Sequence, residues 1–307
     1  MKSIFYKNKQ LLVLIVKILI VLGAFYFIYK QLADNDKLNW TNFLIIFEKQ
    51  KSISGVIFIL FLSFLNRFLE ILKWQNLVSS FQKISLRDTT KQVLAALTAG
   101  IFTPNGIGEY AGKALYFEKK ETKKIVFLNL ICNGIQMILS IFFGLIGLWV
   151  LGFKKWVFYL IMLSVLLFVF SVFFKNITIK GNSLKSILKK IKEIPTKIHQ
   201  KNIVFAILRY LTFSHQYYFL FLAFGVHQPY FILMATIASV YFLASSLPTF
   251  QFFDFAVKGG VAVYFFNLLF VNEWIVVFIS TVMWFLNIVI PVIIGSYFVI
   301  KFKPKWN

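Results

Sequence analysis

Long apolar stretches alternate with short polar segments along most of the chain. A transmembrane helix needs roughly 20 apolar residues, and six stretches approach or exceed that length. They are residues 11–29, 53–73, 125–151, 156–174, 203–224 and 274–300. The pattern predicts an all-α, polytopic integral membrane protein, with a short interfacial helix at residues 40–48 after the first span.

Two further apolar stretches are each interrupted by a proline. The interrupted stretches are residues 92–103 and 110–117 around Pro104, and residues 230–247 and 255–270 around Pro248. A helix of a dozen residues is only about 18 Å long, too short to cross the bilayer. We therefore expect two re-entrant helical hairpins in addition to the six full spans.

The two interruptions resemble each other in sequence. After each proline the chain reads acid, aromatic residue, Ala, any residue, Lys, from Glu109 to Lys113 and again from Asp254 to Lys258. The same offset separates the two acids and the two lysines. Proline-broken segments at matching positions of two halves are typical of transporters with internal repeats and a central site. The alternative is two independent helix breaks that happen to look alike.

Composition agrees with a membrane protein, since 59% of residues are hydrophobic and 14% are charged. The net charge is +22, but the basic residues are scattered over loops and belong to no nucleic-acid-binding module, so we expect no nucleic-acid partner. With both termini in the cytoplasm, 22 Lys and Arg fall in cytoplasmic segments and 6 in outside loops. This split follows the positive-inside rule and predicts a multi-pass protein of the cytoplasmic membrane.

This topology also sets the domain organisation that we expect. The first hairpin enters from the cytoplasm and the second from outside, so the two halves are related by inversion. The single transmembrane domain divides into residues 1–51 (anchor and interfacial helix), 52–174 (first repeat), 175–201 (basic cytoplasmic linker) and 202–307 (second repeat). The sequence is compatible with both a monomer and a homo-oligomer.

The linker contains an amphipathic segment. From Ser183 to Ile198, apolar residues recur at helical spacing and lysines occupy the other face. One interpretation is a solvated cytoplasmic helix. The other is a helix lying on anionic lipid of the inner leaflet near residues 175–201.

Arginine usage singles out two positions. Among 33 Lys and Arg residues only Arg67, Arg87 and Arg209 are arginines, and Arg67 and Arg209 lie within predicted spans. Arginine is preferred where a planar, always-charged fork binds phosphate or carboxylate. Arg67 is also spaced to pair with Glu70 one turn later. Arg209 has no acid within a turn, so we expect a distant partner or a ligand there.

The first hairpin supplies a second candidate anion site. After Pro104, Asn105 and Gly106 the chain restarts as a helix near Gly108, whose first N–H groups could bind phosphate. Glu109 lies in that first turn, and Lys113 follows at i+4. A self-contained pair of Glu109 with Lys113 is the alternative. Gly108 and Gly112 have the spacing of a close helix contact.

Four motifs resemble one family over nearly the whole chain. They are Arg67-x-x-Glu70-x-x-x-Trp74, Thr103-Pro104-Asn105-Gly106-Ile107-Gly108-Glu109-Tyr110, Leu247-Pro248 and Trp284-x-x-Asn287-x-x-x-Pro291. They look like the lysylphosphatidylglycerol synthase transmembrane family, also called flippase-like domain proteins. The resemblance implies translocation of a lipid. In bifunctional members of the family, synthase activity belongs to a separate soluble domain, which we do not expect here. Residues 249–253 lack the glycines usual after the second proline.

These observations predict a lipid transporter whose substrate is a phospholipid or a polyprenyl-phosphate. Its phosphate would be held by Arg67, Arg209, Lys113 and Lys258. The acids Glu70, Glu109 and Asp254 would balance those charges or bind a cationic headgroup. The alternatives are a membrane-embedded transferase with Glu109 or Asp254 as base, and a non-catalytic partner of a cell-envelope enzyme. No metal or cofactor is expected, since the histidines lack ligand spacing and Cys132 is the single cysteine.

Overall fold

The computed structural model describes residues 52–101, 103, 106–179, 182–247 and 254–303. The first half contains α3 (Ile53–Val78), α4 (Leu86–Gly100), α5 (Ile107–Ala114), η1 (Lys119–Glu121), α6 (Thr122–Val150) and α7 (Lys154–Phe173). The linker holds β1 (Thr178–Ile179), β2 (Asn182–Ser183) and α8 (Leu184–Lys192). The second half contains α9 (Thr196–Ala223), α10 (Tyr230–Ser246), α11 (Asp254–Asn267), α12 (Glu273–Trp284), the π-helix η2 (Phe285–Val289) and α13 (Ile290–Ile300). The predicted all-α fold is confirmed, apart from the two-residue antiparallel ladder of β1 and β2.

Within the described part of the chain, four helices are long and apolar enough to cross a membrane. They are Ile53–Val78, Lys119–Val150, Lys154–Phe173 and Glu273–Ile300, each inside or around a predicted span. The predicted span at 203–224 lies in α9, which has 28 residues but carries polar groups such as Asn202, Arg209 and Gln216 along its length. The predicted span at 11–29 and the interfacial helix at 40–48 lie outside the described residues. The full count of six spans stays a prediction.

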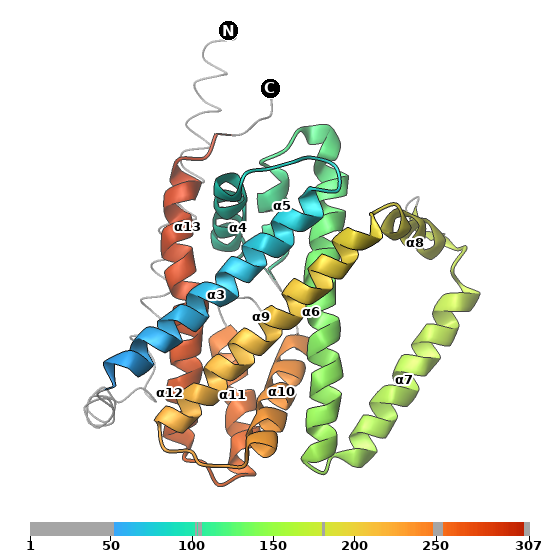
Figure 1. Cartoon of the computed structure of the whole chain (residues 1–307). Coiled ribbons are helices and arrows are strands. Elements are labelled where there is room, and N and C mark those ends of the chain that lie inside the picture. The colour runs from blue at the N-terminus through green and yellow to red at the C-terminus, as the bar shows by residue number, and fades with distance from the viewer. Residues whose placement is uncertain (1–51, 102, 104–105, 180–181, 248–253, 304–307) are drawn as a thin grey trace.

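The interrupted stretches form two pairs of packed helices. α4 packs on α5, and α10 packs on α11. In Figure 1 the first pair lies toward the upper end of the molecule and the second toward the lower end. Gly106 begins α5 with a φ of 67°, a left-handed conformation that favours glycine. Pro104 and Pro248, which interrupt the two stretches in sequence, lie outside the described residues.

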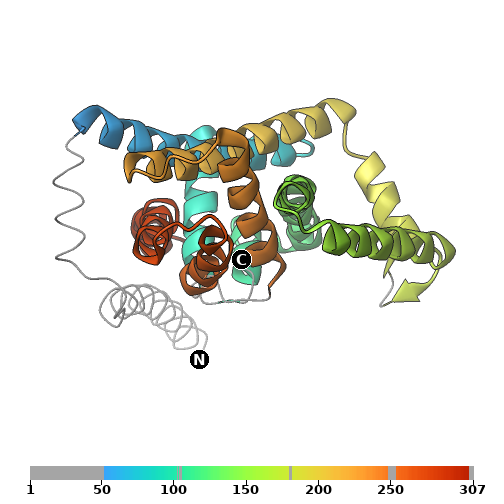
Figure 2. The same ribbon diagram turned by 90° about the horizontal axis from the view of Figure 1, so that it is seen from below.

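Contacts between the two halves are reciprocal. α3 packs against α9, α6 packs against α10, and α13 packs against α4. The two long helices α3 and α9 lie side by side across one face of the molecule, as Figures 1 and 2 both show. Thr98 Oγ1 of α4 donates a hydrogen bond to the Val292 carbonyl of α13 at 3.1 Å. Each hairpin is therefore packed against a long helix of the other half.

Glycines allow these close contacts. A Cβ atom on Gly108 would lie 2.8 Å from the Ala99 carbonyl oxygen, and one on Gly112 would lie 3.0 Å from Ala96 Cα. The predicted close helix contact at Gly108 and Gly112 is thus confirmed between α5 and α4. Gly147 brings α6 against the backbone of α10 in the same way.

The α7 helix lies apart from the other spanning helices. Val157 is the one buried residue along its 20 residues. In Figures 1 and 2 the helix projects to one side and returns through α8 to α9. Its apolar side chains are therefore exposed in the way expected of a helix surrounded by lipid.

The linker helix is shorter than the sequence pattern predicted. The amphipathic segment from Ser183 to Ile198 is divided, because α8 ends at Lys192 and Pro195 caps the start of α9. Proline has no N–H and disfavours helical geometry in the residue before it, so one helix cannot run through Pro195. Ile194, one of the expected apolar positions, is buried against Ile71 and Trp74 of α3 in a hydrophobic cluster.

The contact between α6 and α10 can be tested with a matched pair of glycine substitutions in α6. In Gly147→Ala the new Cβ would meet the Ala235 carbonyl oxygen and lie 2.8 Å from Ser239 Oγ. We expect a loss of about 1–3 kcal/mol in stability from this overpacking. Gly134→Ala has no atom within 4 Å of its Cβ and should be neutral or slightly stabilising. Thermal unfolding of the purified protein measures both, and equal midpoints would contradict the contact.

Candidate functional site

A stripe of polar side chains runs along the otherwise apolar helix α3. Asn66, Arg67, Glu70 and Lys73 are spaced so that they share one face of the helix. The helices α6 and α9 cover α3. Asn66, Glu70 and Lys73 are buried in this interface. Charges inside a predicted span are costly unless they are paired, so the partners of these side chains define the candidate site.

Glu70 is the centre of this cluster. Its Oε2 atom lies 3.1 Å from Nη1 of Arg209 and 3.4 Å from Nζ of Lys73. Its Oε1 atom accepts a weak hydrogen bond from Cys132 Sγ at 3.7 Å. The side chains of Lys73 and Glu70 are 0% and 6% exposed, so water screens this pair very little. The distant partner expected for Arg209 is therefore Glu70, and the hydrogen bond of Arg67 goes elsewhere.

Arg67 is held by the last spanning segment. Its Nη2 atom donates to the Asn287 carbonyl oxygen at 2.5 Å. The Asn287 side chain accepts from Asn66 Nδ2 at 2.6 Å and donates to Gln216 Oε1 at 3.0 Å. Asn287 lies in the π-helix, a distortion that is frequent at functional sites. The contact joins α3, α9 and the α12–α13 segment at one point.

Helix α6 contributes an amide stripe that faces these charges. Gln136 Oε1 accepts from Lys73 Nζ at 3.4 Å and from Arg209 Nη1 at 3.3 Å. One turn earlier, Asn133 Nδ2 donates to the Tyr110 hydroxyl of α5 at 3.3 Å. Asn129, a further turn back, is fully buried. Helix α6 therefore supplies an amide oxygen, Gln136 Oε1, that accepts hydrogen bonds from two cations inside the protein.

Lys113 of α5 is buried at 1% exposure. Its Nζ atom donates to Asn129 Oδ1 at 2.6 Å and lies 4.6 Å from the centre of the Trp74 ring, a cation–π contact. Trp74 Nε1 in turn donates to Gln92 Oε1 at 2.8 Å. Lys113 is thus held between α3 and α6 by Asn129 and Trp74.

A cavity of about 220 Å³ adjoins the Arg67 and Arg209 side chains. Its walls come from α3, α6, α9, α10, α11, α12 and η2. The lining residues are Asn66, Arg67, Gln136, Ser140, Arg209, Phe213, Tyr217, Val240, Tyr241, Lys258, Ser280, Met283, Trp284, Asn287 and Ile288. We call it the central cavity. It brings together Arg67, Arg209 and Lys258, three of the four cations that the sequence predicted to hold a phosphate, while Lys113 is not among its lining residues.

Three buried donors on the arginine and glutamine side chains that line the cavity have no hydrogen-bond partner within the described protein. They are Nε of Arg67, Nε of Arg209 and Nε2 of Gln136. A buried donor left unsatisfied costs about 1–3 kcal/mol, and more when it carries charge. The cavity wall is therefore suited to an acceptor-rich anion that approaches the two guanidinium groups together.

Positive charge exceeds negative charge in this region. The cations are Arg67, Lys73, Lys113, Arg209 and Lys258. Among side chains that the structure describes, two carboxylates oppose them: Glu70, and Glu109 on α5, which lies within electrostatic range of Arg67. The side chain of Asp254 lies outside the description. Among the described side chains around the cavity, cations therefore outnumber carboxylates, which is compatible with an anionic ligand.

The start of α5 differs from the expected phosphate cradle. Gly108 N–H donates to Thr103 Oγ1 at 2.7 Å, and Glu109 N–H donates to the Gly106 carbonyl at 2.9 Å. These two donors are occupied by the chain itself, and neither glycine lines the central cavity. Both glycines thus have a structural role at the start of α5, and their phosphate-binding role stays a prediction. Pro104 and Asn105 lie outside the described residues.

The sequence analysis missed several site residues. Lys73 and Gln216 were not assigned a role, and neither were the amides Asn129, Asn133 and Gln136. A signal was present, because amides at helical spacing inside an apolar stretch share one face. Among the described residues, no group of three or more His, Cys, Asp and Glu side chains could hold a metal ion.

The fold and the site together define a helical protein with membrane-length apolar helices and a cationic central cavity. Comparisons with protein-family models, with curated proteins and with solved structures found no match to this chain.

The buried ion cluster predicts a large cost for removing its carboxylate. Glu70→Gln leaves Arg209 and Lys73 without their anion, and breaking a buried pair on one side typically costs about 3–5 kcal/mol. Glu118→Gln removes the exposed partner of Lys120 and should leave the unfolding temperature unchanged. Thermal unfolding in detergent micelles compares the two variants. A Glu70→Gln protein as stable as the Glu118→Gln protein would argue against the buried cluster.

Proposed function

We propose that this protein translocates a phosphate-bearing lipid between the leaflets of the cytoplasmic membrane. The observation that carries the proposal is the central cavity, where Arg67 and Arg209 each have a buried Nε donor without an acceptor. Two guanidinium groups and the amine of Lys258 match the oxygens of a phosphate, which accepts charge-assisted hydrogen bonds. The cavity lies among membrane-length helices, which agrees with lipid as the substrate.

The size of the cavity favours a headgroup over a whole lipid. Sites for drug-sized ligands usually enclose about 300–1,000 Å³. The central cavity is smaller, at about 220 Å³, and its wall includes Phe213, Tyr217 and Tyr241. A phosphate group fits this space, whereas the acyl or prenyl chains must remain outside between the helices and the surrounding lipid.

Within this proposal the ion cluster has a defined part. Arg209 uses Nη1 for Glu70 and Gln136, which fixes the guanidinium, while its buried Nε atom has no hydrogen-bond partner. Arg67 uses Nη2 for the Asn287 carbonyl in the same manner. Both arginines would thus be pre-oriented for an incoming phosphate, so little side-chain ordering would be lost on binding. Lys113 and Lys73 would add to the positive potential from behind the cavity wall.

The reciprocal packing of the halves supports an inverted-repeat mechanism. The α4–α5 and α10–α11 pairs lie toward opposite ends of the molecule in Figure 1, and each packs on a long helix of the other half. In inverted-repeat transporters, one half rocks against the other around a fixed central site. The resemblance of the Arg67–Trp74 and Thr103–Tyr110 motifs to flippase-like domain proteins agrees with lipid as the cargo.

The membrane orientation can be tested on described residues. We expect the α6–α7 connection outside and the linker helix α8 in the cytoplasm, because the charge split follows the positive-inside rule. Lys155→Cys and Lys189→Cys are made singly in a background with Cys132→Ser, and both positions are exposed. A membrane-impermeant maleimide on intact cells should label position 155 and spare position 189. The reverse labelling pattern would contradict the proposed inverted arrangement.

Arg209→Lys tests whether the guanidinium holds phosphate. Lysine keeps the charge and can still pair with Glu70, but it lacks the second edge that a phosphate would use. Loss of a hydrogen bond to a charged group, about 1.5–3 kcal/mol, should slow lipid translocation about tenfold or more. The measurement is leaflet exchange of fluorescent phospholipid in proteoliposomes, with lipid mass followed in parallel to detect a transferase.

The matched control is Lys201→Arg, an exposed position on the same helix outside the central cavity. It should translocate lipid at the wild-type rate. A purely structural Arg209 would show itself differently, through lower stability and a normal rate per folded molecule. That result would remove Arg209 from the proposed site.

A further inference from the structure

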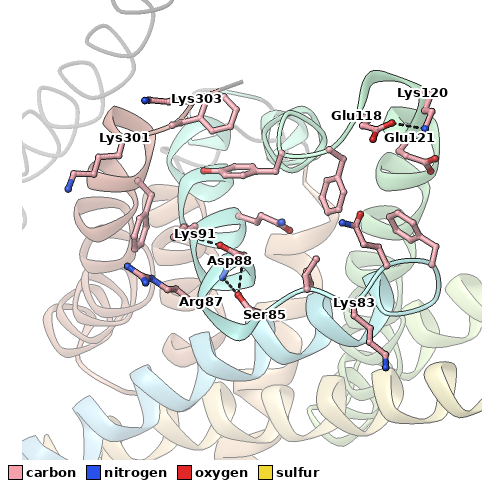
Figure 3. A pocket seen from close by; sticks show the side chains of 18 of the residues that line it. Lys83, Ser85, Arg87, Asp88, Lys91, Glu118, Lys120, Glu121, Lys301 and Lys303 are labelled. Carbon is pink, nitrogen blue, oxygen red and sulfur yellow. Dashed lines mark hydrogen bonds and ion pairs between the residues drawn. The ribbon is translucent and has the colours of Figure 1, made fainter. Parts of the chain in front are cut away.

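A second, larger pocket lies away from the central cavity. It has a volume of about 850 Å³ and forms where the α3–α4 connection, the α5–α6 connection and the C-terminal end of α13 meet (Figure 3). Its charged lining residues are Lys83, Arg87, Asp88, Lys91, Glu118, Lys120, Glu121, Lys301 and Lys303. We call it the basic pocket. Its three contributing segments are remote in sequence, and the charge count predicts that all three lie in the cytoplasm.

The charges around the basic pocket do not balance. Six cations line it against three carboxylates, a surplus of three positive charges. Lys91 pairs with Asp88 at 3.0 Å and Lys120 pairs with Glu118 at 2.6 Å, as Figure 3 shows. Both pairs are solvent-exposed and therefore weak, so they do not fix the cations against a competing anion.

The cations that remain come from different walls. Lys83 lies before α4, Arg87 lies in its first turn, and Lys301 follows α13. Lys301 Nζ donates to the Tyr297 hydroxyl at 2.6 Å, which keeps the amine at the rim. Figure 3 shows these side chains at the periphery of the pocket, with the Lys83 and Lys301 amines on opposite sides and directed outward. The positive-inside rule explains basic residues at a cytoplasmic end, but it does not require them to surround a shared pocket.

Aromatic rings form much of the rest of the wall. Tyr116 and Phe302 lie 4.7 Å apart between ring centres, and Phe81 and Phe117 lie 6.0 Å apart. Burial raises the pKa of Tyr116 to about 12, so its hydroxyl remains protonated and can donate a hydrogen bond. A pocket with a cationic rim and an aromatic wall suits a ligand that combines phosphate with a less polar group.

We propose that the basic pocket binds a phosphorylated group that carries at least two negative charges. The group can belong to a phosphomonoester lipid headgroup of the inner leaflet or to a soluble phosphate compound, since both present the same oxygens. The volume falls within the usual range of ligand sites, about 300–1,000 Å³. The surplus of three positive charges matches a polyanion, and binding should weaken as salt screens the exposed cations. The site is separate from the central cavity, with which it shares no lining residue.

The test uses the full chain in nanodiscs of neutral phosphatidylcholine. Isothermal titration calorimetry measures inorganic pyrophosphate and short-chain phosphatidic acid as separate titrants, with short-chain phosphatidylcholine as the chain control. The pocket variant combines Lys83→Gln, Arg87→Gln and Lys301→Gln, all exposed positions. The matched control combines Lys185→Gln, Lys189→Gln and Lys190→Gln on α8, which removes the same charge from exposed positions outside the pocket.

We expect the wild-type protein to bind at least one phosphate titrant saturably, and the pocket variant to bind it about tenfold more weakly or worse. The α8 control should stay within about twofold, because diffuse charge contributes little once salt screens it. Binding of phosphatidic acid alone assigns the site to a lipid headgroup, and binding of pyrophosphate alone assigns it to a soluble compound.

Three results would overturn the proposal. The first is no saturable binding of either titrant to the wild type. The second is an equal loss in the α8 control, which would mean nonspecific attraction. The third is loss of binding in Arg209→Lys, which would place the titrant in the central cavity instead. If the triple pocket variant unfolds at a lower temperature than wild type, Lys83→Gln and Arg87→Gln are measured singly, and unchanged binding in both would also overturn it.

Discussion

The pairing of Glu70 with Arg209 and Lys73 is the constraint on which the rest of the structure depends. A single buried carboxylate in an apolar helix costs several kcal/mol unless a cation reaches it. Its partners come from α3 itself and from α9, and Gln136 of α6 bonds both cations. The three helices must therefore take one relative position. A slip of α9 by a single turn would take Arg209 away from Glu70, so the ion cluster specifies the register between the halves.

Close packing elsewhere follows from that register. Along α6, the amides at 129–136 lie between residues of two hydrophobic clusters, one toward each end of the helix. Gly144 and Gly147 then let α6 touch the backbone of α10, and Gly295 lets α13 touch α4. Apolar packing at both ends excludes water from the middle, and a water-poor middle strengthens each charged contact there. The polar centre and the apolar ends therefore stabilise the same arrangement.

The sequence predicted those features that depend on residues close together in the chain, such as helix positions and local spacing. Periodicity and length located the hairpin helices and most spans within a few residues, and the spacing of Gly108 and Gly112 identified a close helix contact. It also indicated a distant partner for Arg209.

The identity of that partner could not be predicted, because Glu70 is remote from Arg209 in sequence. Helical spacing was equally compatible with a local pair between Glu70 and Arg67. At the start of α5, Thr103 Oγ1 and the Gly106 carbonyl accept two of the backbone N–H groups through a local turn, which spacing does not reveal. The basic pocket could not be predicted from the sequence either, because its basic residues belong to three segments that only the folded chain brings together.

The position of two arginines beside one cavity is what distinguishes a binding site from a purely structural network. Buried ion pairs are poor stabilisers, and well-packed apolar residues of similar volume are often as good or better. A network that served only to join α3, α6 and α9 would be expected to balance its charges, as Glu70 does for one cation. Instead, Arg67, Arg209 and Lys258 adjoin one cavity, and both guanidinium groups have Nε donors without acceptors. Unpaired guanidinium donors among apolar helices lower the stability of the fold. An anionic ligand that accepts hydrogen bonds from them would recover that stability. Under the proposed function a headgroup phosphate is that ligand, and it would enter and leave with the lipid that carries it.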